Sequence, residues 1–251
     1  MPMIATAADA AANRRRGQAA DGVTFWHTLY LGTSRYNRAS GTPDPDPDAL
    51  FPMAFLVEQD PGSVATAHYH QADQFQVVVD GHAMMGIHKA DPITVHFAGA
   101  YSAYGPIRAG DEGVQYFTLR NRFDPGARFM SDQANRAALR TIHSRTHRET
   151  VVGPHPLTEA EGLRTLVPWE PDGLVAWRYT LGSGAPVAGP EPATGGGQYW
   201  LVLAGSLFCE VGSMGHLSCA FIRPDEAAFQ GITGRDGLDV VVMQFPGSRT
   251  R

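Results

Sequence analysis

The chain has 251 residues, of which 43% are hydrophobic and 18% are charged, and this composition excludes a protein that is disordered throughout. Its formal net charge of −5 disfavours a nucleic-acid partner, because such proteins gather Lys and Arg against phosphate. No apolar stretch approaches the roughly 20 residues that span a bilayer, and residues 1–20 lack the apolar region of a secretory signal. We therefore expect a soluble, cytoplasmic protein without a nucleic-acid or membrane partner.

The first 20 residues are rich in alanine and contain one short basic run, Arg14 to Arg16, which predicts a flexible, solvated tail. Beyond them, 28 Gly and 18 Pro separate short runs of β-branched and aromatic residues, a texture typical of an all-β protein. The pair Asp80-Gly81 predicts a tight turn between two of these runs. The best strand candidates are residues 53–58, 75–79, 82–88, 93–97 and 115–120.

An internal repeat organises the chain. Residues 74–81 superpose on 198–205 at a shift of 124, and the same shift places 115–120 on 239–244 with mostly apolar residues opposite apolar residues. A repeat of this length predicts two self-sufficient barrels or sandwiches rather than the rungs of a solenoid. The expected domains are residues 21–130 and 166–251, joined by a connector over 131–165 with one short helix.

Polar residues with a regular spacing follow Gly62. His68 and His70 are two positions apart, so on a strand they point to the same face and can offer imidazole nitrogens to one cation. Gln74 lies four positions further on, and Gly81 closes the hairpin after the strand that Gln74 begins. This spacing predicts a metal site made of His68, His70 and Gln74.

The segment GSVATAHYHQADQFQVVVDG resembles the first signature motif of the cupin superfamily, which reads G-x5-H-x-H-x3-E-x6-G. Every fixed position matches except one, because Gln74 stands where the family has Glu and keeps an oxygen ligand without its negative charge. The resemblance implies two cupin (jelly-roll) β-barrels in tandem, the first of which holds a divalent metal ion such as Zn, Ni or Fe(II).

The second cupin motif normally supplies a third histidine, and residues 91–107 have no His at its place. Tyr104 is the best candidate to fill this position as a base or a ligand, although an aromatic residue in a strand also fits core packing. His88 and His96, on neighbouring strands, are alternatives. Arg120, at the end of an expected strand, could bind a substrate carboxylate through two hydrogen bonds, or could form a surface salt bridge instead.

The second half of the chain has lost the motif. The shift of 124 places Pro192 opposite His68 and Thr194 opposite His70, and Phe229 stands where the second motif has its histidine. We expect a C-terminal barrel without metal ligands that has a structural role.

Two classes of function follow. The first is a metal-dependent enzyme that polarises a small organic substrate by Lewis-acid chemistry, as a lyase, isomerase or cyclase. Its redox variant, an Fe(II) dioxygenase, is the second choice because the carboxylate of the two-His-one-carboxylate site is missing. The second class is a non-catalytic cupin that binds a small molecule. A monomer and a homodimer both fit the sequence.

Overall fold

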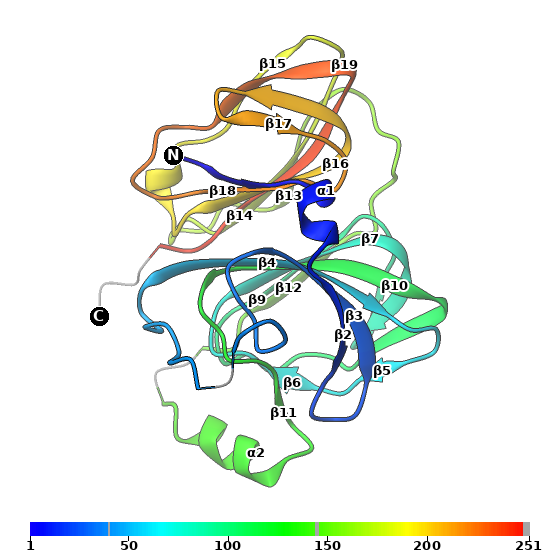
Figure 1. Cartoon of the computed structure of the whole chain (residues 1–251), viewed down its shortest axis with the longest axis vertical. Helices are drawn as coiled ribbons and strands as arrows, with labels where there is room; N and C mark the ends of the chain where they lie inside the picture. Colours follow the sequence, from blue (N-terminus) through cyan, green and yellow to red (C-terminus); the bar gives the residue numbers. More distant parts are fainter. Residues whose placement is uncertain (40, 144–145, 248–251) are drawn as a thin grey trace. The chain divides into compact units, whose positions relative to one another are not determined.

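The computed structural model describes residues 1–39, 41–143 and 146–247, and it divides the chain into two compact β units (Figure 1). One unit spans Asn13–Leu157, and the other combines Met1–Ala12 with Thr158–Arg251. In the described ranges, no helix is both long and apolar enough to cross a membrane.

The N-terminal unit is built around an antiparallel sheet with the strand order β12-β9-β7-β10-β4-β3-β2. Strands β5 and β8 extend it at β10 and β7, and β6 pairs with β11 as a separate ribbon. The elements are β2 (Arg14–Gln18), β3 (Thr24–Leu31), β4 (Leu50–Gln59), β5 (Val64–Ala65), β6 (His68–Tyr69), β7 (Gln74–Met85), β8 (His88–Ala90), β9 (Thr94–Ala98), β10 (Ile107–Arg122), β11 (Arg128–Phe129), α2 (Gln133–Arg140) and β12 (Glu149–Val152).

The C-terminal unit has an antiparallel sheet with the order β1-β18-β16-β19-β14-β13, extended by β15 at β19 and β17 at β16. Its elements are β1 (Met3–Ala5), α1 (Ala7–Ala11), β13 (Gly162–Val167), β14 (Val175–Leu181), β15 (Pro186–Ala188), the 3-10 helix η1 (Pro192–Thr194), β16 (Gln198–Cys209), β17 (Gly212–Met214), β18 (Cys219–Ile222) and β19 (Gln230–Gln244).

The internal repeat reappears as a repeat of strand pairing. β7 pairs with β9 and β10, and β10 pairs with β4; in the same way β16 pairs with β18 and β19, and β19 pairs with β14. The turn glycines correspond as well, because Gly81 and Gly205 have φ angles of 68° and 70°. A Cβ at either position would collide with a backbone carbonyl of the partner strand, Gly113 or Gly237, so both turns require glycine. The predicted all-β fold of two tandem barrels is confirmed.

The first 20 residues differ from the predicted tail, because they contain strands in both units. β1 pairs with β18, and β2 pairs with β3. The basic run lies in β2, where Arg14 forms an ion pair with Glu58 and stacks on Trp26, and Arg16 forms one with Asp60. Because these cross-strand partners are distant in sequence, the basic run alone predicts a solvated segment.

The predicted connector also contains strands. Its helix is present as α2, whose first turn is capped by Asp132, but β12 then joins the edge of the N-terminal sheet beside β9 and β13 pairs with β14. Residue 40 of the predicted first barrel, residues 144–145 of the predicted connector and residues 248–251 of the predicted second barrel lie outside the described residues.

Candidate functional site

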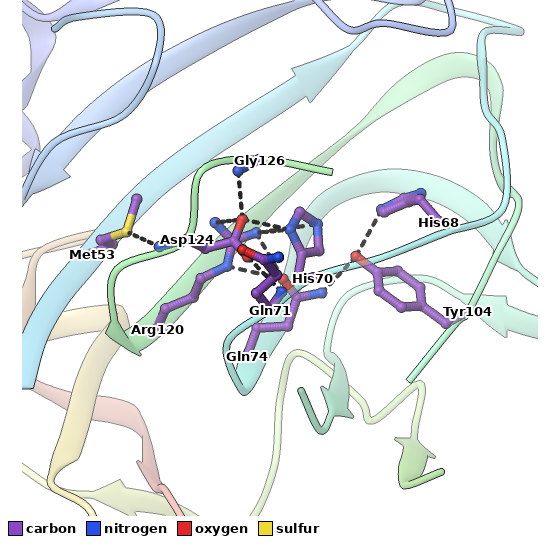
Figure 2. Close-up of polar contacts among 9 residues, drawn as sticks. All are labelled: Met53, His68, His70, Gln71, Gln74, Tyr104, Arg120, Asp124 and Gly126. Atoms are coloured by element: carbon purple, nitrogen blue, oxygen red, sulfur yellow. Dashed lines mark hydrogen bonds and ion pairs between the residues drawn. The ribbon is translucent and has the colours of Figure 1, made fainter. Parts of the chain in front are cut away.

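The three predicted metal ligands lie close together inside the N-terminal barrel (Figure 2). His68 begins β6, His70 follows that strand directly, and Gln74 is the first residue of β7. All three are buried, with 6%, 8% and 0% of their surfaces exposed. The short strand β6 thus turns both imidazoles toward the start of β7.

Each imidazole is held by a hydrogen bond at its Nδ1 atom. His68 Nδ1 lies 2.6 Å from the carbonyl oxygen of Thr66, and His70 Nδ1 lies 2.8 Å from Asp124 Oδ1. Because carbonyl and carboxylate oxygens only accept hydrogen bonds, both rings carry their proton on Nδ1 and keep a lone pair on Nε2. Burial lowers the pKa of His68 to about 3, helped by the neighbouring His70, and burial with the adjacent Arg120 lowers the pKa of His70. Both side chains are therefore neutral near pH 7.

Tyr104 lies at the place that the sequence left open for a third ligand. Its backbone forms an isolated antiparallel bridge with His68, and its hydroxyl oxygen is 2.9 Å from His68 Nε2. The same oxygen accepts a hydrogen bond of 2.5 Å from Gln74 Nε2. Burial raises the pKa of the Tyr104 phenol well above its usual value, so the hydroxyl stays protonated and can donate to His68. This raised pKa opposes the predicted role of a base.

Arg120, near the end of β10, points into the same cluster. Its Nε and NH2 groups donate to Gln74 Oε1 at 3.2 and 2.9 Å, and NH2 is 3.2 Å from His70 Nε2. The side chain is buried, with 4% of its surface exposed. These hydrogen bonds direct the guanidinium to the predicted metal ligands. The sequence predicted instead either two hydrogen bonds to a substrate carboxylate or a surface salt bridge.

Asp124 completes the cluster and was missed by the sequence analysis. Its Oδ1 lies 3.5 Å from Arg120 NH1 and accepts from the backbone N–H of Gly126, while Oδ2 accepts from the backbone N–H of Gln71 at 2.7 Å. Burial alone would raise the pKa of this carboxyl, but His70 and Arg120 outweigh that effect and hold the pKa well below its usual range. The signal that could have found it is the spacing of four positions from Arg120, just beyond the strand end.

These contacts test whether the cluster fits a divalent cation. Such an ion would be bound by His68 Nε2, His70 Nε2 and Gln74 Oε1, yet the last two atoms already lie within hydrogen-bond distance of a positively charged guanidinium. In the described ranges, no group of three or more His, Cys, Asp and Glu side chains gathers as a metal site. The side chains as arranged do not fit a divalent metal at these ligands.

The alternative histidines lie outside the cluster. His96 Nδ1 is 2.8 Å from Gln76 Oε1, and its Nε2 is 3.3 Å from Glu149 Oε1. His88 is exposed on β8. Neither imidazole nitrogen of His96 is therefore directed at His68 and His70.

A cavity of about 110 Å³ adjoins the cluster inside the same barrel. His68, His70, Tyr104, Arg120 and Asp124 form its polar end. Much of the remaining wall is aromatic or aliphatic, and includes Phe25, Tyr36, Met53, Phe55, Val57, Tyr116 and Phe129. Further polar side chains also line it, namely Ser34, Arg35, Gln59, Gln76 and Thr118. His27 also lines it, stacked on Phe55, and its buried Nε2 has no hydrogen-bond partner among the described residues.

The interior of the C-terminal barrel differs in chemistry. Gln198, the counterpart of Gln74, donates to Gln244 Oε1 at 2.8 Å, and Pro192 belongs to η1. Phe229 is buried and packs edge-on against the fully buried Trp200. A pair of glutamines and apolar packing thus occupy the positions that correspond to the cluster of the first barrel.

No protein-family model and no curated protein sequence matches the chain. Solved structures do match over almost its whole length. The bacterial pirin YhhW of Escherichia coli, solved in complex with nickel(II), is 11% identical with a TM-score of 0.60, and the alignment covers 99% of this chain and 100% of that chain. The oxalate decarboxylase of Bacillus subtilis, a protein with Mn(II) centres, is 10% identical with a TM-score of 0.57 over 99% and 78% of the two chains.

A quercetin 2,3-dioxygenase of Acinetobacter baumannii is 13% identical with a TM-score of 0.51 over 100% of this chain and 80% of that chain. All three neighbours are cupin proteins. At these identities the likeness concerns the fold and not the activity. The chain has the two-barrel cupin fold that its repeat and its first motif predict.

Proposed function

We propose that the N-terminal barrel binds a small organic molecule in its cavity, and that Tyr104 and Arg120 act on an oxygen atom of that molecule. The observation that carries this proposal is the lining of the cavity, which combines aromatic and aliphatic walls with the polar groups of the cluster. Apolar walls with a few convergent polar groups are the usual design of a small-molecule site.

The size of the cavity limits the ligand. An apolar protein cavity of roughly 150 Å³ accepts benzene, and this cavity measures about 110 Å³. We therefore infer a ligand no larger than about a single small ring. His27 Nε2, the unpartnered polar atom of the wall, can receive a hydroxyl or amino group of such a ligand.

The cluster supports polarisation of a carbonyl or carboxylate oxygen. The protonated hydroxyl of Tyr104 can donate to that oxygen, and the positive charge of Arg120 stabilises negative charge that develops on it. His68, neutral and hydrogen-bonded to Tyr104, orients this hydroxyl until a ligand oxygen replaces it as the acceptor. Lyase, isomerase or cyclase chemistry uses such groups.

A bulky side chain at the cavity wall is expected to prevent binding. Ala127 lines the cavity and is only partly buried, so Ala127→Trp fills space with little cost to the core. We expect phenol, used as a probe, to bind the wild type and to bind Ala127→Trp at least ten times more weakly in calorimetric titrations. Ala137→Trp, on the exposed face of α2, is the matched control and should bind as the wild type does. Equal affinity for all three proteins would contradict the proposed cavity.

Loss of the phenol hydroxyl is expected to remove the preference for oxygen. The wild type should bind phenol more tightly than benzene, because benzene offers no hydrogen-bond partner to the cluster. Tyr104→Phe removes one hydroxyl and keeps the ring, so the ratio of the two affinities should fall by a factor of about 5–10, equivalent to one hydrogen bond. An unchanged ratio would show that Tyr104 does not contact the oxygen.

A metal-dependent enzyme with Zn, Ni or Fe(II) is the second candidate, in its Lewis-acid or dioxygenase form. The observation that favours it is the fixation of both Nδ1 atoms, because metal-binding histidines usually donate their other N–H to a carbonyl or carboxylate. The pirin solved with nickel(II) and the decarboxylase with Mn(II) centres share the fold. Elemental analysis of protein purified without added metal tests it: one equivalent of metal, lost from His68→Ala/His70→Ala, is the result that this candidate requires.

A further inference from the structure

The polar cluster contains a buried positive charge at the position where a cation would bind. The Arg120 guanidinium is within 3.2 Å of Gln74 Oε1 and His70 Nε2, two of the three atoms that would bind a metal. In Figure 2 the guanidinium lies against the His70 ring, between Asp124 and the Gln74 amide. The NH2 group is nearly equidistant from the two ring nitrogens of His70, at 3.1 Å from Nδ1 and 3.2 Å from Nε2, so the guanidinium occupies the space beside this ring. Its hydrogen bonds to Gln74 Oε1 take up an acceptor atom that a metal needs.

The charges of the cluster balance without a metal. Arg120 contributes one positive charge, and the Asp124 carboxylate, whose Oδ1 lies 3.5 Å from Arg120 NH1, contributes one negative charge. A divalent ion at the three ligands would lie close to the guanidinium in a buried region, where like charges repel strongly. No second carboxylate of the cluster is present to offset that repulsion.

The internal repeat provides a comparison within the same chain. The shift of 124 places Gln244 opposite Arg120, just as it places Gln198 opposite Gln74. Gln198 Nε2 donates to Gln244 Oε1 at 2.8 Å, so each barrel pairs its β7 or β16 glutamine with the same position of its last long strand. The two barrels thus share a side-chain contact between equivalent positions. In the N-terminal barrel one partner of this contact is a cation, and in the C-terminal barrel both partners are glutamines.

We propose that the Arg120 guanidinium, held by Gln74, His70 and Asp124, takes the place of the metal ion in the N-terminal barrel. The Gln74 amide and the His70 imidazole then position Arg120, while His68 accepts a hydrogen bond from Tyr104. This inference concerns the same cluster as the proposed function, but it needs no ligand in the cavity.

Metal titration of tag-free protein tests the inference. Ni(II) and Mn(II) are added separately to the wild type, to Arg120→Gln, which introduces the residue of the other barrel, and to Arg120→Lys, which keeps the charge. We expect no stoichiometric binding to the wild type or to Arg120→Lys, and a gain of at least ten-fold in Ni(II) affinity for Arg120→Gln. The gain should disappear when His68→Ala and His70→Ala are added, which locates the ion at the cluster.

Two results would overturn the inference. One is a wild type that binds one equivalent of either ion and loses it in His68→Ala/His70→Ala, a comparison that stands even where Arg120→Gln does not fold. The other is a folded Arg120→Gln, checked by near-ultraviolet circular dichroism, that binds Ni(II) no better than the wild type. Neither result depends on whether an organic ligand binds in the cavity. The proposed function can therefore fail or succeed independently of this inference.

Discussion

Asp124→Asn is expected to lower the free energy of unfolding by about 3–5 kcal/mol, the usual cost of removing one partner of a buried ion pair. The carboxylate is fully buried, and its Oδ1 lies 3.5 Å from Arg120 NH1. Its loss removes a negative charge that faces the buried guanidinium, and it weakens the acceptor that holds the His70 ring. The loss of stability is expected to come from the buried positive charge that remains on Arg120, and not from the lost attraction of the ion pair itself.

Urea unfolding at pH 7 measures this effect, with Asp111→Asn as the control because that aspartate is exposed on β10. Arg120→Gln/Asp124→Asn removes both charges, so the double variant should be more stable than Asp124→Asn alone. A double variant that is as unstable as the sum of the two single variants would show that the charges do not interact. Because the pKa of Asp124 is lowered in the folded state, its stabilising contribution is present above the unfolded value near 3.9 and is lost as the pH falls below it.

The fold could be predicted because its evidence is local and repeated. Glycines at positions 81 and 205 adopt the same left-handed turn, and His68 and His70 are two positions apart at the short strand β6. Both features can be recognised in the sequence because each depends on local backbone geometry. The role of residues 1–20 could not be predicted in this way, because β1 and β2 depend on partners far along the chain.

The candidate site could be predicted only in part. Tyr104 and Arg120 come together with His68 and Gln74, but the sequence does not reveal what fills the centre of a barrel. Asp124 follows the end of β10, and only the closure of the barrel brings it to His70. The pleat of a strand tells which side chains point inward, whereas the hydrogen bonds among them depend on contacts between strands far apart in sequence.

A fall in pH is expected to lower the free energy of unfolding through protonation of His27. This residue of β3 is 2% exposed and stacks on Phe55, with 4.5 Å between the ring centroids. Burial, with a smaller contribution from the positive charge of Arg120, lowers the pKa of His27 from 6.5 to about 4. The folded protein therefore keeps His27 neutral at a pH where the unfolded chain protonates it.

The sign and size of the effect follow from this difference in pKa. Because the unfolded state binds more protons between the two pKa values, the free energy of unfolding is highest above pH 6.5 and falls as the pH decreases toward 4. A shift of this size is worth about 3 kcal/mol in full, of which about 2 kcal/mol is lost by pH 5. His68, whose pKa is lowered to about 3, acts in the same direction and extends the loss to lower pH.

His27→Phe separates the two histidines, because it keeps an aromatic ring on Phe55 and removes the titration. Urea unfolding at pH 7.5 and pH 5 should show that the variant loses about 2 kcal/mol less stability than the wild type over this interval. His88→Phe, at an exposed position on β8, is the control and should follow the wild type. If His27→Phe and the wild type lose stability equally, His27 is protonated in the folded protein as readily as in the unfolded chain. The unpartnered Nε2 would then be accessible to water in the cavity, and its proposed role as a contact for a bound molecule would lose its basis in burial.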